Sequence, residues 1–147
     1  ALTSKAPLGE KATDLTQSAA ADSGKAAFEQ AGIKPADIDL AQLYDCFSPA
    51  LLIQLEDLGF CEKGAGGEFL ASGATQPGGK LPVNTHGGML SHCHPGNPGA
   101  IFGLTEAIRQ YRGEANERQL PHLEHTLLHA QGGIMSSHAT VVLGRAN

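Results

Sequence analysis

The stretch LPVNTHGGMLSHCHPGNPG, residues Leu81 to Gly99, is the most unusual part of this sequence. From Thr85 onward it holds three of the seven histidines, one of the three cysteines, four glycines and two prolines. Glycine permits tight turns and close backbone approach, and proline ends regular structure, so the composition predicts a shaped loop. A loop that presents several imidazole groups is a candidate site of chemistry.

Regular elements are predicted on both sides of this loop. A short strand, Leu81 to Asn84, precedes it, and a helix with apolar residues at helical spacing, Ala100 to Arg112, follows it and stops at Gly113. Upstream, Ile38 to Tyr44 is a second strand candidate. It leads through Asp45-Cys46-Phe47 into a helix that starts at Ser48-Pro49 and continues to Leu58.

The remaining elements complete a mixed α/β pattern. A helix is predicted from Asp14 to Ala31, and a glycine-rich connection from Cys61 to Gly79. Two strands at the end, Thr126 to Ala130 and Ser137 to Leu143, are joined around Gln131-Gly132-Gly133. We therefore expect an α/β layered sandwich, with residues 1–12 as a linker or loop and one domain over residues 13–147.

Charge and composition exclude several classes of protein. The net charge is -5 without a basic block, which argues against a nucleic-acid footprint. No run is long or apolar enough to cross a membrane, and residues 1–10 lack the pattern of a signal peptide. Three widely spaced cysteines are an odd count, so a disulfide framework is not expected and a reducing, cytoplasmic location is predicted.

The histidines offer donors that suit zinc, so a small metalloprotein using His86, His92 and His94 is one alternative. In an extended chain, His92 and His94 could face one way, but Cys93 would point to the other side. No C-x-x-C or H-E-x-x-H spacing supports a metal. The preferred expectation is that no metal is bound.

Cysteine–histidine chemistry is a second hypothesis. A reactive thiol needs an oriented imidazole nearby, and adjacent Cys93 and His94 are poorly placed to supply one another. The useful pair lies across two loops, with Cys46 at one corner and His94 in the other. The alternative is that Cys46 is a small buried core residue.

Three segments in order resemble the C-terminal domain of thiolases, closest to the sterol-carrier-protein type and its relatives. They are YDCFSPALLIQLEDLGFCEKG (Tyr44 to Gly64), the Leu81 to Gly99 loop, and LLHAQGGIMSSHATVVL (Leu127 to Leu143). They are similar to the family's H-D-C-F corner, its N-x-x-G-G…G-H-P loop and its glycine-containing terminal hairpin. The resemblance covers about residues 26–143, and the middle segment is the most specific.

The resemblance implies roles for individual residues. His94 would take the proton of a nucleophilic cysteine and help to hold the thioester oxygen, and Cys46 would be the acid/base at the α-carbon. Gly132 or Gly133 would supply a backbone N–H of the second oxyanion hole. Asn84, Gly87 and Gly88 match the turn that presents His94. For the turn residues, a structural role is as well supported as contact with substrate.

Two positions depart from the family pattern. Tyr44 stands where the sterol-carrier-protein type has His and other thiolases have Asn, at a position that normally holds a water of the oxyanion hole. Tyrosine there resembles a thiolase-like branch that includes steroid side-chain aldolases, whereas the retained His94 and Cys46 favour thiolase chemistry. Cys93 replaces the glycine of G-H-P, and we interpret it as a packing residue.

The resemblance also implies an architecture and partners. The expected fold is the C-terminal half of an αβαβα sandwich with a mixed five-stranded sheet. The N-terminal half, which carries the nucleophilic cysteine, and the first strand are expected to lie outside this sequence, so the chain alone would be inactive. Expected partners are that half, further copies in a homo- or hetero-oligomer, and a small OB-fold, zinc-ribbon acyl-CoA-binding protein.

The function implied is Claisen cleavage or condensation of 3-oxoacyl-CoA, as in β-oxidation, with coenzyme A as cosubstrate and no tightly bound cofactor. Two alternatives stay open. Tyr44 favours a retro-aldol lyase acting on a 3-hydroxyacyl-CoA. The incomplete site is also compatible with a non-catalytic, acyl-CoA-binding assembly subunit.

Overall fold

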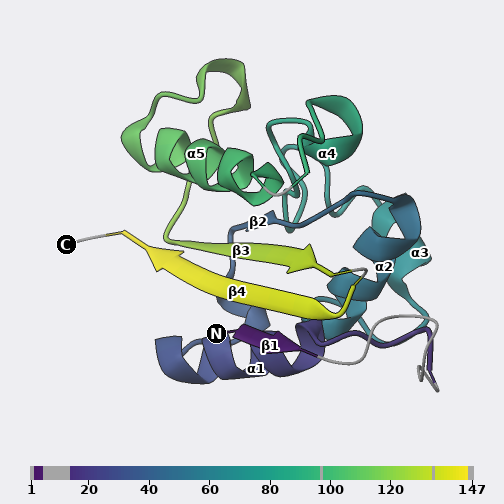
Figure 1. The fold of residues 1–147 in the computed structure, drawn as a ribbon. Coiled ribbons are helices and arrows are strands. Elements are labelled where there is room, and N and C mark those ends of the chain that lie inside the picture. Colours follow the sequence, from purple (N-terminus) through teal and green to yellow (C-terminus); the bar gives the residue numbers. More distant parts are fainter. Residues whose placement is uncertain (1, 5–13, 97, 134, 146–147) are drawn as a thin grey trace.

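The computed structural model describes residues 2–4, 14–96, 98–133 and 135–145. Its strands and helices follow one another along the chain as shown in Figure 1; they are β1 (Leu2–Ser4), α1 (Ala20–Ala31), β2 (Leu40–Gln42), α2 (Ser48–Asp57), α3 (Gly66–Ala71), α4 (Gly88–Ser91), α5 (Gly99–Arg112), β3 (His125–Gly132) and β4 (Ser137–Gly144). Short 3₁₀ turns lie at Pro35–Asp37 and Asn116–Arg118. None of these helices is both long enough and apolar enough to span a bilayer.

The sheet lies between two groups of helices. Its strand order is β1-β4-β3-β2, with β2 parallel to β3 and the other neighbours antiparallel. Helix α5 packs against β2 and β3 on one face, and α1 packs against β4 on the other (Figure 1). The three residues of β2 are all buried, as expected for a strand covered on both faces. This arrangement confirms the predicted α/β layered fold.

The sheet differs from the prediction in two places. Residues 2–4 form the edge strand β1 beside β4, so the expectation of a linker over residues 1–12 is wrong for this part. Residues 5–13 lie outside the described residues. The described strands number four, not five, because Val83 makes only an isolated bridge to Ala41. Pro82 has no N–H to donate, and Asn84 leaves the extended region with a φ of 50°.

Helix α1 ends as predicted, with Gly32 in the left-handed conformation at a φ of 71°, but it begins at Ala20 rather than Asp14. The side chain of Asp14 accepts hydrogen bonds from the N–H and hydroxyl of Thr16, which favours a turn over a helix. Ser18 then bonds through its N–H and hydroxyl to Asp57 at the end of α2. These side-chain contacts delay the start of the helix.

Helix α3 was not predicted, since residues 61–79 look like a glycine-rich loop. Its first residue, Gly66, donates its N–H to the Glu56 carboxylate of α2 at 3.0 Å. A carboxylate at a helix N-terminus satisfies a backbone donor that has no partner inside the helix. Tertiary contact therefore stabilises a helix that propensity alone does not indicate.

A buried hydrogen-bond chain links the terminal hairpin to α1. His129 Nε2 lies 3.0 Å from His138 Nδ1, and His129 Nδ1 lies 2.8 Å from the Thr140 hydroxyl, which lies 2.8 Å from that of Ser23. His138 Nε2 lies 3.0 Å from the carbonyl oxygen of Met135. A carbonyl only accepts, so this bond makes Nε2 of His138 a donor and Nδ1 an acceptor in the neutral ring. All four side chains are essentially inaccessible to solvent.

This pair makes stability depend on pH. Burial, with the neighbouring His138, lowers the pKa of His129 to about 3. In the unfolded chain this imidazole takes up a proton near pH 6.5, whereas in the folded chain it stays neutral until the pH approaches 3. The contribution of His129 to the free energy of unfolding is therefore fully present above pH 6.5 and is lost as the pH falls towards 3. We predict a loss of roughly 3 kcal/mol from this residue between pH 7 and pH 4. Urea unfolding across that range measures it.

The parent protein is compared with two variants. His129→Gln removes the titrating group, and His122→Gln is the control, because the His122 side chain is 69% exposed. The His129 variant should lose less stability than the parent on acidification, and the control should follow the parent. Equal losses in all three proteins would contradict the assignment.

Candidate active site

The corner between β2 and α2 is fixed through its backbone by a buried side chain. Gln54 of α2 is fully buried. Its Oε1 accepts the N–H of Tyr44 at 3.0 Å, and its Nε2 donates to the carbonyl of Tyr44 at 2.7 Å and to that of Ala50 at 3.0 Å. Both polar groups of the Tyr44 backbone are thus bound to one carboxamide. The segment from Tyr44 to Phe47 leaves the strand in a defined direction.

The second loop is held against the same strand by Asn84. Its Oδ1 accepts the N–H of Leu43 at 2.8 Å, and its Nδ2 donates to the carbonyl of Leu43 at 2.9 Å. The side-chain amide thereby extends the parallel pairing of Val83 with Ala41 by one step. The N–H of Gly87 donates back to the Asn84 carbonyl to close the turn. Asn84 therefore has a structural role, and contact with substrate stays a prediction for it.

A buried carboxylate joins the corner to the loop. Asp45 is 5% exposed, and its Oδ1 accepts the N–H of Met89 at 2.6 Å in the first turn of α4. Gly88 has a φ of 63°, and a Cβ added there would overlap the Asp45 carboxylate. Gly87, at a φ of 105°, is also in a region that L side chains rarely adopt. The sequence pattern predicts these glycines in the turn, but it does not indicate that Asp45 binds the backbone of the loop.

These contacts bring two of the predicted site residues together. The Tyr44 hydroxyl lies 3.3 Å from Nε2 of His94, and the two rings meet edge to face with centroids 5.7 Å apart. They come from loops fifty positions apart in the sequence. Burial, and then the neighbouring Cys46, raises the pKa of Tyr44, so the phenol is neutral at physiological pH. The pair can exchange a proton with a ligand at the surface.

Cys46, the third predicted residue, is half-buried beside this pair. Its sulfur accepts a hydrogen bond from Nε2 of Gln131 at 3.3 Å. Burial raises the pKa of the Cys46 thiol, and hydrogen bonds from the backbone and from Gln131 oppose that effect. Gln131 is the last side chain of β3 before Gly132. Neither Gln131 nor Gln54 was singled out in the sequence, because an isolated glutamine carries no motif.

The predicted oxyanion residues lie in the turn that follows. Gly132 and Gly133 are both exposed, and Gly133 has a φ of 58°. A Cβ on Gly132 would meet no atom within 4 Å, so packing does not require glycine there. The open surface leaves room for a ligand, and the role of these N–H groups stays a prediction.

The structure separates the three histidines proposed as metal ligands. His86 and His92 meet edge to face with ring centroids 5.8 Å apart, and His92 also packs on Phe102, whereas His94 faces Tyr44. Within the described ranges, no three His, Cys, Asp or Glu side chains are grouped as a metal site requires. Cys93 is exposed, which does not fit the packing role expected for it.

A cavity of about 340 Å³ lies behind the His94 loop, between His92 and α5. His86 lines it, and neither buried ring nitrogen of His86 has a hydrogen-bond partner among the described residues. Burial lowers the pKa of this imidazole. Glu106 also lines the cavity, and its carboxylate accepts hydrogen bonds from the Arg118 guanidinium at 3.0 Å and from the Thr85 hydroxyl.

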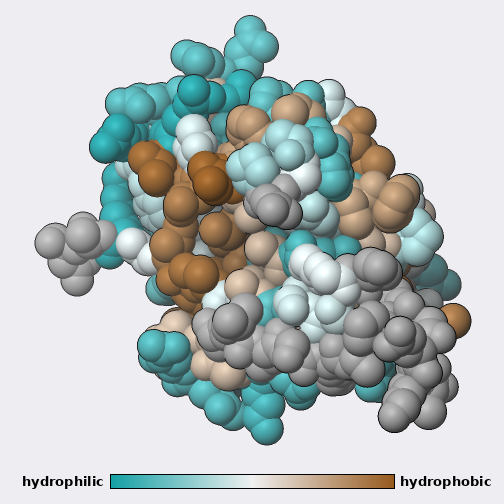
Figure 2. Space-filling model, in the orientation of Figure 1, coloured by the Kyte–Doolittle hydropathy of each residue, from teal (hydrophilic) through white to brown (hydrophobic). Residues whose placement is uncertain are grey.

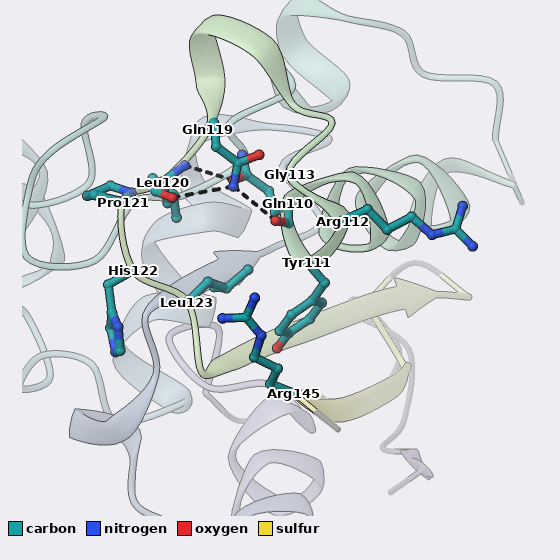
Figure 3. Close-up of a pocket in the computed structure, with 10 residues that line it drawn as sticks. All are labelled: Gln110, Tyr111, Arg112, Gly113, Gln119, Leu120, Pro121, His122, Leu123 and Arg145. Atoms are coloured by element: carbon teal, nitrogen blue, oxygen red, sulfur yellow. Dashed lines mark hydrogen bonds between the residues drawn. The ribbon is translucent and has the colours of Figure 1, made fainter. Parts of the chain in front are cut away.

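A second hollow, of about 260 Å³, is formed at the C-terminal end of α5 (Figure 3). Nε2 of Gln119 donates to the backbone carbonyl of Gln110 there, and Oε1 of Gln110 accepts the N–H of Leu120. The Tyr111 hydroxyl lies 2.8 Å from the carbonyl oxygen of Leu143. None of the predicted site residues lines this hollow, so the Tyr44–His94 surface is the candidate active site.

Comparison with known proteins identifies the family. Residues 3–145 match the thiolase C-terminal domain-like family. The chain belongs to this family. The match covers almost the whole sequence, and the corner, loop and hairpin described above are the parts that carried the resemblance.

The relatives of this thiolase C-terminal domain include both thiolases and lyases. It is 44% identical over 78% of its length to a 17-hydroxy-3-oxo-4-pregnene-20-carboxyl-CoA lyase of Mycobacterium tuberculosis. It is 38% identical over 90% of its length to an acetyl-CoA acetyltransferase of Methanothermobacter thermautotrophicus. It spans only 28% and 35% of those two proteins.

A solved structure, the Ltp2-ChsH2(DUF35) aldolase, superimposes with a TM-score of 0.86 at 33% identity. The match covers 99% of the thiolase C-terminal domain and 38% of the aldolase chain. The thiolase-like fold predicted from the sequence is confirmed.

We predict that Gly88→Ala destabilises the domain by about 1–3 kcal/mol, because alanine is strained at a positive φ and its Cβ would displace Asp45. The matched control is Gly67→Ala in α3, where a Cβ meets nothing within 4 Å. The control should be neutral or slightly stabilising. Urea unfolding of both variants measures the difference, and equal stabilities would show that Gly88 is not required.

Proposed function

We propose that this thiolase C-terminal domain forms part of an enzyme that cleaves the bond between the α- and β-carbons of a CoA thioester, by retro-aldol chemistry on a 3-hydroxyacyl-CoA. The observation that carries the proposal is the 3.3 Å contact between the Tyr44 hydroxyl and Nε2 of His94. A retro-aldol step needs a base for the β-hydroxyl proton and needs no covalent acyl-enzyme. A tyrosine paired with a histidine supplies that base.

The proposed step conserves atoms and electrons. The Tyr44 oxygen accepts the proton of the substrate's β-hydroxyl as the phenol passes its own proton to His94. The oxygen's electrons form the carbonyl of the leaving aldehyde or ketone, and the electrons of the broken carbon–carbon bond form a CoA-thioester enolate. Protonation of that enolate at the α-carbon gives the shortened acyl-CoA.

Cys46 is the proposed proton donor to the α-carbon. It lies two residues from Tyr44 in the same corner, and its half-buried thiol has a raised pKa, so it carries a proton at neutral pH. Delivering a proton to an enolate from a positioned thiol is general acid catalysis. The same thiol would remove the α-proton in the reverse direction.

Thiolysis of a 3-oxoacyl-CoA is the second candidate. Cys46 favours it, because this reaction also passes through a CoA-thioester enolate, and the acetyl-CoA acetyltransferase relative supports it. His94 would then activate a nucleophilic cysteine contributed by the N-terminal half of the fold. Coenzyme A would be the cosubstrate, and no tightly bound cofactor would be needed.

The proposed partner is that N-terminal half. Figure 2 shows a brown, apolar area over α5 and the adjoining sheet. Exposed apolar residues of these elements include Ile101 (60%) and Ile108 (41%) of α5 and Val141 (43%) of β4. Exposed apolar clusters of this kind are typical of interfaces. A complex with a small OB-fold, zinc-ribbon acyl-CoA-binding protein is proposed by analogy with the Ltp2-ChsH2(DUF35) aldolase.

The decisive variants are Tyr44→Phe and His94→Gln in the domain assembled with its N-terminal half. We predict that each lowers kcat for cleavage of a 3-hydroxyacyl-CoA by about 10²- to 10⁴-fold, because the base for the hydroxyl proton is lost. Release of the carbonyl product measures the rate. Thiolysis of a 3-oxoacyl-CoA that survives Tyr44→Phe but not His94→Gln would favour the second candidate. Tight acyl-CoA binding without either reaction would indicate a non-catalytic assembly subunit.

The interface is tested by Ile108→Glu and Val141→Glu. We predict that each weakens association with the N-terminal half at least about tenfold, since a charge would be buried without a partner. Gln30→Glu on α1, on the other side of the sheet, is the control and should bind normally. Isothermal titration calorimetry measures the affinities, and unchanged binding by both α5-side variants would exclude this surface.

A further inference from the structure

We propose that Gln131 is a positioning residue for the Cys46 thiol, held in one orientation by Gln54, so that the sulfur always faces an amide N–H. This role of Gln131 rests on the proposed function, because the role of Cys46 at the α-carbon is part of that proposal. The carrying observation is a continuous hydrogen-bonded path from the backbone of Tyr44 through two glutamines to the sulfur of Cys46.

The orientation of Gln54 follows from its backbone partners. Its Oε1 accepts the N–H of Tyr44, which can only donate. Its Nε2 is shared by the carbonyl oxygens of Tyr44 and Ala50, which can only accept. Rotating the carboxamide by 180° would oppose donors to donors and acceptors to acceptors, so one orientation is selected. Because Gln54 is fully buried, water cannot compensate for the reversed one.

The orientation of Gln131 then follows from Gln54. Nε2 of Gln54 also lies 3.3 Å from Oε1 of Gln131. Its two hydrogens are engaged by the carbonyl oxygens of Tyr44 and Ala50, so this third contact is a shared, longer one, and it favours the Gln131 oxygen rather than the amino group on the side of α2. The amino group of Gln131 consequently points to Cys46, at 3.3 Å from the sulfur. Gln54 and Gln131 lie on α2 and β3, 77 positions apart in the sequence, so the path exists only in the folded protein.

The Gln131 amide stabilises the charged form of a thiol that its other surroundings disfavour. Burial raises the pKa of Cys46, and the nearby Asp45 carboxylate acts in the same direction. The opposing groups are the backbone N–H groups of Cys46 and Phe47 and the Gln131 side chain. The facing phenol of Tyr44 is neutral at physiological pH and adds no charge. Of the groups that lower the pKa of the Cys46 thiol, Gln131 is the one that acts through its side chain. A substitution can therefore remove its effect on the thiol pKa without altering the backbone of the corner.

The consequence concerns proton transfer at the α-carbon. A thiol that donates to an enolate becomes a thiolate, and a directed N–H stabilises the charge that develops on the sulfur. The donor is already oriented before the reaction, so no side chain needs to turn during the step. Gln131 would therefore affect kcat more than KM.

The experiment measures the pH dependence of Cys46 alkylation by iodoacetamide in the assembled protein, with the Cys46 peptide quantified by mass spectrometry. Gln131→Met removes the donor at similar size, and we expect the apparent pKa of the thiol to rise by about half to one pH unit. Gln131→Glu places a carboxylate there, and the rise should be larger. Gln30→Met on the exposed surface of α1 is the matched control and should titrate like the parent.

Circular dichroism and thermal unfolding identify any variant that fails to fold, and Gln131→Leu, which also lacks an N–H donor, is the second variant that keeps the test available. An unchanged titration in folded Gln131→Met or Gln131→Leu would overturn the inference.

The outcome is separable from the proposed function. A shifted alkylation profile without turnover of either CoA thioester would leave the inference standing and remove the function. Turnover by the parent with no shift in the Gln131 variants would leave the function and remove the inference. If both hold, kcat should fall in Gln131→Met while KM stays within about twofold.

Discussion

The buried carboxamide of Gln54 is the interaction on which the site depends. It binds both backbone polar groups of Tyr44 and reaches Gln131 on β3. A fully buried amide that lost these partners would carry a large desolvation penalty, so the folded state strongly favours one arrangement of the corner. Tyr44 and Cys46 both lie in this corner, two positions apart in the sequence.

The two loops are joined by a similar principle, in which polar side chains substitute for backbone pairing. Asn84 bonds to Leu43 as a strand residue would, and Asp45 accepts the N–H of Met89 in the first turn of α4. Such contacts place the His94 loop relative to the corner. The Tyr44–His94 contact is exposed, whereas the Asp45 carboxylate that supports it is buried.

The candidate site residues could be chosen from the sequence, but the side chains that hold them in place could not. His94, Tyr44 and Cys46 were recognised because they belong to motifs with fixed spacing. Gln54, Gln131 and the His129–His138 pair lie within two of the family-like segments, but the resemblance gives them no role, and their hydrogen bonds join separate elements of the fold. The same limit explains α3, whose first turn is stabilised by Glu56 rather than by its own glycine-rich sequence.

The sequence by itself determined the α/β class, the family resemblance and the stopping points of α1 and α5, because periodic apolar residues and glycines with positive φ act locally. Only the tertiary structure decided which side chains meet. It turned His92 towards His86 and Phe102 while His94 faces Tyr44. It also gave the Cys46 thiol a directed amide donor. The reason is physical, since hydrogen bonds between buried groups depend on distances that spacing along a chain does not specify.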